Sequence, residues 1–298
     1  MPNQPGLNPQ QVRQFQNDGY LIIRDVLSHE SIRPLIVELQ QKVDDLASAA
    51  ADRGLLDSAG TFADAPFDQR LARLSGACSD GNWFWRQFRT IGKYKSPGMF
   101  RLRTDPDLLN VVQSLIGPEI LAHPQYALRA KLPDHEHTVV PWHQDLGYLD
   151  PGSAGDTLIV NCWMPLVPAT AENGCLQVLA GSHRFGQLPH ERWTDDQDHS
   201  APVGIAEADL PEGQIITCEV DVADVLLTME RVVHRSISNT SDTVRWSVDS
   251  RYCCIDMPTG RTGVPGFVAR SQRDRQRVAQ SYEDWIQLFA DAQVDLKR

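Results

Sequence analysis

Residues Trp142-His143-Gln144-Asp145-Leu146 place an imidazole and a carboxylate one residue apart. Side chains alternate between the two faces of an extended strand, so His143 and Asp145 are predicted to project to the same side and to bind one ion together. A third ligand is available far along the chain, at His234. Two histidines and one carboxylate form the facial triad that leaves coordination positions open on non-heme Fe(II). The sequence therefore suggests an iron site.

The His-x-Asp triplet is a weak signal when it is taken alone. With nine histidines in an Asp-rich chain, about one such triplet is expected by chance, and a solvated strand end is the alternative interpretation. The surrounding motifs favour the metal site. Asn173-Gly174-Cys175-Leu176 and Gly181-Ser182-His183-Arg184 lie between the two ligand candidates, and Arg245 follows His234 by eleven residues.

The order of these motifs resembles the phytanoyl-CoA dioxygenase family of Fe(II)- and 2-oxoglutarate-dependent oxygenases. The resemblance extends from about residue 8 to residue 290 and includes Glu172-Asn173-Gly174 and His234-x-Ser236. It implies a mainly β fold with flanking helices, the double-stranded β-helix or cupin-like jelly roll. It also implies a dioxygenase that uses Fe(II), 2-oxoglutarate and O2, releases succinate and CO2, and hydroxylates an unactivated carbon of a medium-sized metabolite. Nothing near the motifs indicates a coenzyme A pocket.

Length and composition indicate the domain count and argue against some classes of protein. A chain of 298 residues is expected to form one domain, residues 1–298, and no apolar run approaches the roughly 18 residues that a membrane span requires. The net charge of −11 disfavours nucleic acid, and the arginines between residues 270 and 277 are expected to lie on a solvated helix face. Six cysteines without regular spacing and a polar amino terminus favour reduced thiols in the cytoplasm. The oligomeric state stays open.

Helix signals dominate the first part of the chain and strand signals the rest. Helices are expected after the caps Asn8, Ser28 and Asp105, and an amphipathic helix is expected near Tyr282. Residues 53–100 show no clear period, and Trp83-Phe84-Trp85 is expected to form a satellite core cluster. Short β-like runs follow, separated by turn residues: 120–132, 139–148, 157–167, 175–179, 215–220, 224–229, 232–238 and 244–255. Residues 185–213 are polar and are expected to form a lid or an insertion near the opening of the site.

The run from Arg245 to Arg251 alternates strictly at its start. The alternation places Arg245, Ser247, Asp249 and Arg251 on one face, which a strand turns inward only toward a ligand or a charged partner. A guanidinium matches a carboxylate with paired donors, so Arg245 is predicted to bind the distal carboxylate of 2-oxoglutarate, with Ser247 or Ser236 adding a hydroxyl. The alternative is an ion pair between Arg245 and Asp249 inside the barrel.

The resemblance implies further contacts at less certain positions. It places a tryptophan beside the cosubstrate, matched in this chain by Trp163. It also uses a lysine and a residue on the preceding strand, for which the nearest candidates are Lys95 and one of Gln125, Ala127 and Leu128. Tyr148 and Leu149 are expected to line the opening for the substrate. Two other classes fit part of the pattern: a non-catalytic cupin-like protein that binds a metal or small acid, and a zinc hydrolase, which would need a positioned general base that is not evident.

Overall fold

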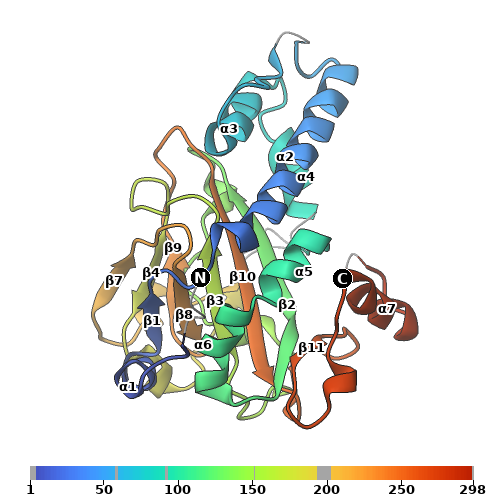
Figure 1. Cartoon of the computed structure of the whole chain (residues 1–298). Coiled ribbons are helices and arrows are strands. Elements are labelled where there is room, and N and C mark those ends of the chain that lie inside the picture. Colours follow the sequence, from blue (N-terminus) through green and yellow to red (C-terminus); the bar gives the residue numbers. More distant parts are fainter. Residues whose placement is uncertain (1–4, 58–59, 91–92, 151, 193–202, 297–298) are drawn as a thin grey trace.

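Two antiparallel sheets face each other in the computed structural model, which describes residues 5–57, 60–90, 93–150, 152–192 and 203–296 (Figure 1). The larger sheet has the strand order β1-β8-β3-β10-β2-β11 and the smaller one β7-β4-β9. These strands are β1 (Tyr20–Ile23), β2 (Ile120–Lys131), β3 (Val160–Pro165), β4 (Leu176–Leu179), β7 (Ile215–Cys218), β8 (Val225–Met229), β9 (His234–Ser236), β10 (Arg245–Cys254) and β11 (Phe267–Arg270). The arrangement is the expected jelly roll, a double-stranded β-helix with flanking helices.

The helices begin where the sequence provides caps. Asn8 and Gln11 form a capping box at α1, and Gly19 ends that helix in the left-handed conformation at φ 78°. Ser28 caps α2, and Asp105 caps α6. The helices are α1 (Pro9–Asp18), α2 (His29–Asp52), α3 (Phe67–Ala77), α4 (Trp83–Thr90), α5 (Pro97–Arg103), α6 (Pro106–Ile116) and α7 (Tyr282–Asp291). Each expected cap is confirmed.

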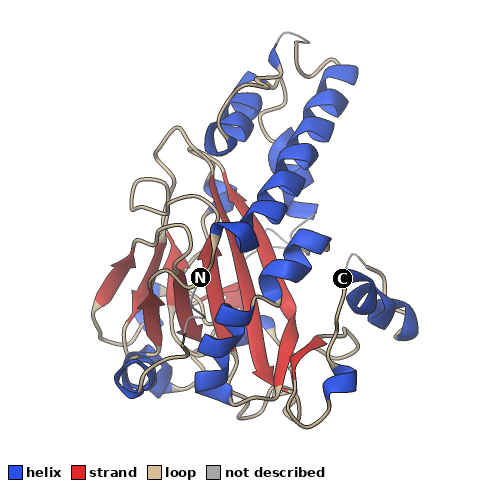
Figure 2. Cartoon of the chain, in the orientation of Figure 1, coloured by secondary structure: helices blue, strands red, loops and turns tan. Residues whose placement is uncertain are grey.

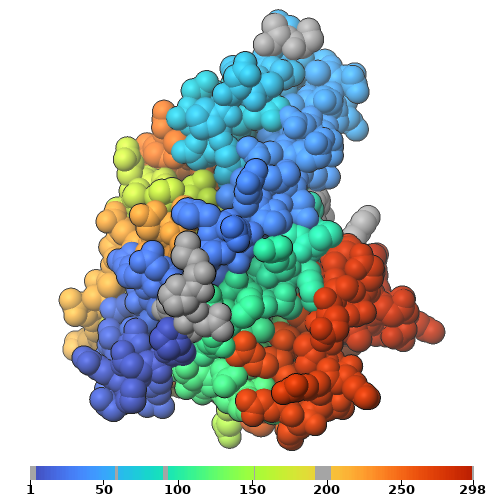
Figure 3. Space-filling view, in the orientation of Figure 1, coloured from blue at the N-terminus to red at the C-terminus, as the bar shows by residue number. Residues whose placement is uncertain are grey.

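The helices cover one face of the larger sheet (Figure 2). On that face Trp246 of β10 is fully buried, with the ring of Phe67 stacked at 5.2 Å and that of Phe88 edge-on at 5.1 Å. Tyr126 of β2 packs against Trp285 of α7, with ring centroids 5.6 Å apart. This outer layer is the main core of the protein, and Figure 3 shows how the helical segments enclose it on the side in view.

The opposite face of the larger sheet points into the barrel. Strand register pairs Arg245 with Lys131, Ser247 with Arg129, and Asp249 with both Ala127 and Trp163. Because paired residues in a ladder project to the same side, the inner face combines polar side chains from β2, β3 and β10. The sequence predicted this inward alternation for β10, and the register shows which residues of the neighbouring strands join it.

Three expectations about local structure were wrong. The described part of residues 53–100 contains helices α3 and α4 and the start of α5 rather than an aperiodic stretch, and Trp83 and Phe84 belong to the main hydrophobic core rather than to a satellite of it. Residues 139–148 are not a strand: His143 makes an isolated bridge to His234, and a 3-10 helix begins at Asp145. The arginines of residues 270–277 do not share a helix face, because β11 ends at Arg270 and a 3-10 turn covers Arg275–Arg277.

The polar segment 185–213 lies only partly within the described residues, since residues 193–202 fall outside them. Its two described ends pair through the short strands β5 (Glu191–Arg192) and β6 (Val203–Gly204). The backbone N–H of Ile205 donates to the carbonyl of Trp142 at 2.7 Å. The described end of the segment therefore packs against the His-x-Asp stretch. That the segment is a lid or an insertion near the site stays a prediction.

The structure also shows the state of the cysteines and the character of the helices. All six cysteines are free thiols, as expected, and five of them are buried. Among the described residues, no helix combines the length and the apolar character needed to cross a membrane.

Candidate metal and cosubstrate site

His143 and His234 are held together by their own backbones. Each N–H donates to the carbonyl oxygen of the other residue at 2.9 Å, and the two imidazole centroids lie 4.2 Å apart. Residues far apart in the chain thus become neighbours through a single antiparallel bridge. The bridge to His234 stands where a longer strand over residues 139–148 was expected.

The chain turns immediately after His143, and Gln144 stabilises the turn. The buried Gln144 amide donates to the carbonyl oxygens of Gly186 and Arg231 at 2.8 and 2.6 Å and accepts from the N–H of Leu188 at 2.8 Å. His190 accepts from the Gln144 N–H at 3.0 Å. Because its amide is fully used in structure, Gln144 is a scaffold residue of the motif.

The turn brings Asp145 to the two histidines. Its Oδ1 lies 3.8 Å from His143 Nε2 and 3.9 Å from His234 Nε2, and all three side chains are buried. Within the part of the chain that the structure describes, this is the one cluster of histidine, cysteine or acidic side chains with the spacing of a metal site. The strand geometry predicted from the sequence was wrong, but the proximity of His143 and Asp145 was right.

The orientation of both imidazoles suits metal binding. His143 Nδ1 bonds the carbonyl of Pro141 at 2.8 Å, and His234 Nδ1 bonds that of Val232 at 3.1 Å. These bonds leave each Nε2 directed at the centre of the cluster, which is how ligating histidines are usually fixed. Burial and the neighbouring His234 lower the pKa of His143 to about 3, so this imidazole is neutral and available as a ligand. The donor set fits Fe(II) in a facial triad.

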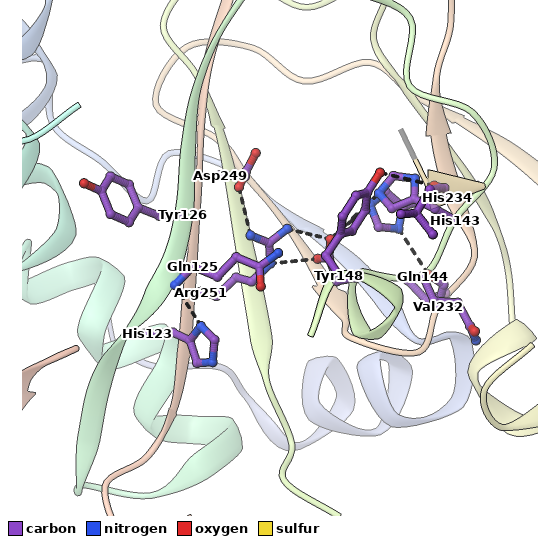
Figure 4. A network of polar contacts seen from close by, with 12 residues as sticks. His123, Gln125, Tyr126, His143, Gln144, Tyr148, Val232, His234, Asp249 and Arg251 are labelled. Carbon is purple, nitrogen blue, oxygen red and sulfur yellow. Dashed lines mark hydrogen bonds and ion pairs between the residues drawn. The ribbon is translucent and has the colours of Figure 1, made fainter. Parts of the chain in front are cut away.

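Arg251 connects this cluster to strand β10 (Figure 4). Its Nε donates to Asp145 Oδ2 at 3.0 Å and its Nη2 to Oδ1 at 2.5 Å, while Nη1 lies 3.2 Å from Asp249. Although burial opposes ionisation of Asp145, the Arg251 guanidinium holds the pKa of that carboxyl well below its usual range. The sequence placed Arg251 on the inward face but gave it no role, because the contact joins positions 106 residues apart.

The second cationic group of the cavity is Arg245. It is 3% exposed, its Nη1 donates to Ser247 at 2.5 Å, and its guanidinium lies 5.1 Å from the ring centre of Trp163. Its buried Nε has no hydrogen-bond partner among the described residues. A buried guanidinium with an unused donor and no carboxylate partner in the described part of the chain is suited to bind an anionic ligand. The alternative interpretation, an ion pair between Arg245 and Asp249, is not found, because Asp249 pairs with Arg251 and Arg129 instead.

Lys131 lies beside Arg245 in the strand register and was missed in the sequence. It is 1% exposed, and its Nζ donates to the carbonyl of Thr138 at 2.8 Å and to the hydroxyl of Ser236 at 3.1 Å. Burial, together with the positive charge of Arg245, lowers its pKa to about 6. The alternation of residues along β2 could have indicated that Lys131 faces inward. The sequence alone did not show that Lys131 lies opposite Arg245, because that depends on the register between β2 and β10.

The expectation that Lys95 contacts the cosubstrate does not fit the structure. Its Nζ lies 4.6 Å from the ring centre of Phe289 and donates to the carbonyl of Leu296, between the larger sheet and α7. It also faces the ring of Tyr126 at 6.0 Å, on the helix-covered face of β2. Lys95 therefore lies on the wrong side of the sheet, and Lys131 is the lysine that the inner face supplies.

The remaining predicted residues divide between the cavity and the core. Gln125 points toward Arg251 (Figure 4), is 8% exposed, and has an Oε1 without a partner among the described residues. Tyr148 packs edge-on against His143 at 5.3 Å and donates to the carbonyl of Val203 at 3.2 Å, so it flanks the site as expected. Leu149 does not: it is buried in a small apolar cluster with Ala154, Ile159 and Cys253. The 3-10 turn, absent from the prediction, rotates Leu149 into that cluster.

A jelly roll with a buried His-Asp-His cluster and a buried arginine on the inner face of the same barrel is typical of the class of non-heme iron oxygenases. The profile of the family "Phytanoyl-CoA dioxygenase (PhyH)" matches residues 15–247. The chain belongs to this family. It is an Fe(II)- and 2-oxoglutarate-dependent dioxygenase, as the resemblance implied.

Individual relatives are distant. The chain is 22% identical to the ectoine dioxygenase of Bordetella parapertussis over 254 residues, which cover 81% of this chain and 74% of that protein. Among solved structures, the non-heme monooxygenase ThoJ in its apo form has a TM-score of 0.62 at 19% identity and covers 95% of this chain and 96% of its own. EctD from S. alaskensis with bound Fe has a TM-score of 0.55 at 19% identity, with 94% and 89% covered. These likenesses show the shared fold.

Proposed function

We propose that this dioxygenase hydroxylates an unactivated carbon of a medium-sized small molecule, consuming 2-oxoglutarate and O2 and releasing succinate and CO2. The observation that carries the proposal is the triad, in which His143 Nε2 and His234 Nε2 lie 3.8 and 3.9 Å from Asp145 Oδ1. Three protein ligands on one face leave positions for a bidentate oxoacid and for dioxygen. Iron bound there would supply the oxidative chemistry.

The side chains of the protein bind and orient 2-oxoglutarate. We assign Arg245 to the distal carboxylate of 2-oxoglutarate because its guanidinium is buried on the inner face of the barrel and has no carboxylate partner among the described residues. Trp163 forms a wall beside that guanidinium, and Ser247 accepts from it. Ser236, already fixed by Lys131 and by the N–H of Val140, is placed to donate its own hydroxyl proton to the cosubstrate.

The substrate opening is assigned to the side of Tyr148 and the described ends of segment 185–213. Tyr148 shields His143, and Val203 holds the Tyr148 hydroxyl. Gln125 contributes an amide on the inner face near Arg251. The free thiols of all six cysteines support a reducing compartment such as the cytoplasm.

The experiment combines a spectrum with a product assay. Under anaerobic conditions, Fe(II) plus 2-oxoglutarate should give a weak visible charge-transfer band, and His234→Ala should lose both the band and the iron. His137→Ala is the matched control, because its imidazole is 52% exposed and is not part of the cluster. Admitting air should then produce succinate, and the metabolite that raises its rate most is the substrate candidate.

Two results would count against this function. A band retained at full iron content in His234→Ala would exclude the assigned triad. A protein that binds iron and 2-oxoglutarate but releases no succinate, with any metabolite or with none, would behave as the cupin-like binder that the sequence left as an alternative.

A further inference from the structure

One arginine on the inner face of the barrel is not explained by iron or by the cosubstrate. Arg129 is the single exposed residue of β2, in a strand whose other members are buried or half-buried. Its register with Ser247 places it on the face that carries Arg245 and Asp249. Its side chain is nevertheless 53% exposed, whereas Arg245 is 3% exposed. The two arginines therefore occupy the outer and the deep part of one polar surface.

Arg129 makes one weak ion pair with the described residues of the protein. Its described ion pair joins Nε to Asp249 Oδ2 at 3.6 Å, which is beyond hydrogen-bond range. Asp249 is already paired with Arg251 at 3.2 Å. A long, exposed pair of this kind contributes on the order of 0–1 kcal/mol to stability. The guanidinium fork of Arg129 is thus available to a ligand.

The charge balance of the inner face indicates the sign of that ligand. The described side chains there include four basic groups, Arg129, Lys131, Arg245 and Arg251, against two carboxylates, Asp145 and Asp249. Fe(II) and the 2-oxoglutarate dianion cancel each other. Even with Lys131 neutral, as its pKa of about 6 indicates, one positive charge stays uncompensated. The chain as a whole carries −11, so this local excess runs against the overall composition.

The position of Arg129 places this excess at the opening of the site. Its Nε lies 3.6 Å from Asp249, and its charge also acts on the hydroxyl of Tyr148, whose ring packs against His143. In Figure 4 Arg251 lies between Asp249 and Tyr148. The deep end of the cavity, by contrast, holds Arg245, Lys131 and Ser236. Arg129 is therefore the half-exposed end of the chain of charged contacts that runs through Asp249 and Arg251 toward Asp145, whereas Arg245, assigned to the cosubstrate, is buried.

We propose that the substrate carries a carboxylate, which Arg129 binds at the opening of the barrel while the carbon to be oxidised lies over the triad. This proposal rests on the proposed function and names the substrate class. One uncompensated positive charge matches a carboxylate, and the planar fork of a guanidinium matches it in shape. A neutral substrate would leave the half-exposed arginine and its excess charge without a role.

The test uses simple probes in place of the unidentified substrate. Straight-chain carboxylates from butanoate to octanoate, and the corresponding primary amides, are titrated into the anaerobic complex of protein, Fe(II) and saturating 2-oxoglutarate. Binding is followed as a shift of the visible charge-transfer band. The band itself, recorded before any probe is added, establishes iron and cosubstrate binding separately. Its absence in the unmodified protein would reject the proposed function, not the assignment of Arg129.

The variants are Arg129→Gln, Arg129→Lys and the matched control Arg24→Gln. Arg24 is similarly exposed, at 61%, and is paired with the buried Asp224 away from the site. The expected result is that carboxylates bind the unmodified protein and the Arg24 variant, bind Arg129→Gln about ten- to a hundredfold more weakly, and bind Arg129→Lys with intermediate affinity. The amides should bind all four proteins weakly.

Three outcomes would overturn the proposal. These are carboxylate binding that survives Arg129→Gln, amides that bind as well as carboxylates, and the failure of every carboxylate to shift the band of the unmodified protein. A loss of the initial band in Arg129→Gln would also overturn it, because Arg129 would then belong to the cosubstrate site.

Discussion

Arg251 donates two hydrogen bonds to Asp145, from Nε to Oδ2 at 3.0 Å and from Nη2 to Oδ1 at 2.5 Å, with both side chains almost fully buried. The carboxylate proposed to bind iron is therefore already neutralised by an arginine. Ionic pairing of this kind fixes the geometry of a buried carboxylate more than it stabilises the fold, because desolvation offsets much of the attraction. The relationship couples strand β10 directly to the iron ligands.

Arg251→Gln should lower the stability of the iron-free protein by about 3 to 5 kcal/mol, since it leaves the Asp145 carboxylate buried without its charge partner. Fe(II) supplied anaerobically should then raise the melting temperature more in the variant than in the unmodified protein, because the metal replaces the missing positive charge. Melting curves with and without Fe(II) measure both effects. Equal iron-free melting temperatures would contradict the role assigned to Arg251.

Arg245→Ala should weaken 2-oxoglutarate binding by about ten- to a hundredfold, the value of a lost charge-assisted paired hydrogen bond. Iron content should stay the same, because Arg245 does not contact the triad. Arg235→Ala is a control of the same type, since Arg235 lies on β9 but bonds Gln177 at 2.9 Å and covers the Trp142 ring. A large fall in melting temperature with unchanged 2-oxoglutarate affinity would show that Arg245 has a structural role and does not bind the cosubstrate.

Lys131→Met should flatten the pH dependence of stability. The folded pKa of Lys131 is lowered by burial to about 6, below its unfolded value, so between these two values the unfolded state binds more protons and stability rises with pH. Removing the amine should reduce the slope by up to about 1.4 kcal/mol per pH unit in that window. Urea unfolding at several pH values from about 6.5 to about 8.5, all inside the window, measures the slope. An unchanged slope would show that Lys131 is protonated in the folded protein.

Gly174→Ala should destabilise the protein by about 2 to 4 kcal/mol, combining a left-handed backbone with overpacking. Gly174 has φ +87°, and an added Cβ would collide with Lys131 Cε and lie 2.7 Å from the carbonyl oxygen of Ile237. Gly54→Ala separates the two causes, because Gly54 has φ +70° with nothing within 4 Å. Thermal unfolding of both variants is the measurement. If Gly174→Ala and Gly54→Ala lose similar amounts of stability, overpacking at the Asn-Gly motif is ruled out.

The sequence by itself determined the local elements and the chemical identity of the site. Caps such as Asn8, Ser28 and Asp105 specify helix starts through hydrogen bonds to residues two or three positions away, so they can be recognised without tertiary information. The alternation of β10 likewise showed that Arg245, Ser247 and Asp249 face inward. The motif order was sufficient to name the family.

Only the tertiary structure decided which of these residues meet. His143 and Asp145 approach each other through a 3-10 turn held by Gln144, not through strand alternation, because the bonds that hold the turn come from Gly186, Leu188 and Arg231. The inner face carries Lys131 and not the predicted Lys95 because of the strand register, which pairs residues far apart in the chain. The contacts of Arg251 and Arg129 depend on the same register. Such long-range pairing leaves no local pattern in the sequence, since each strand is compatible with several partners until the barrel closes around the buried charges.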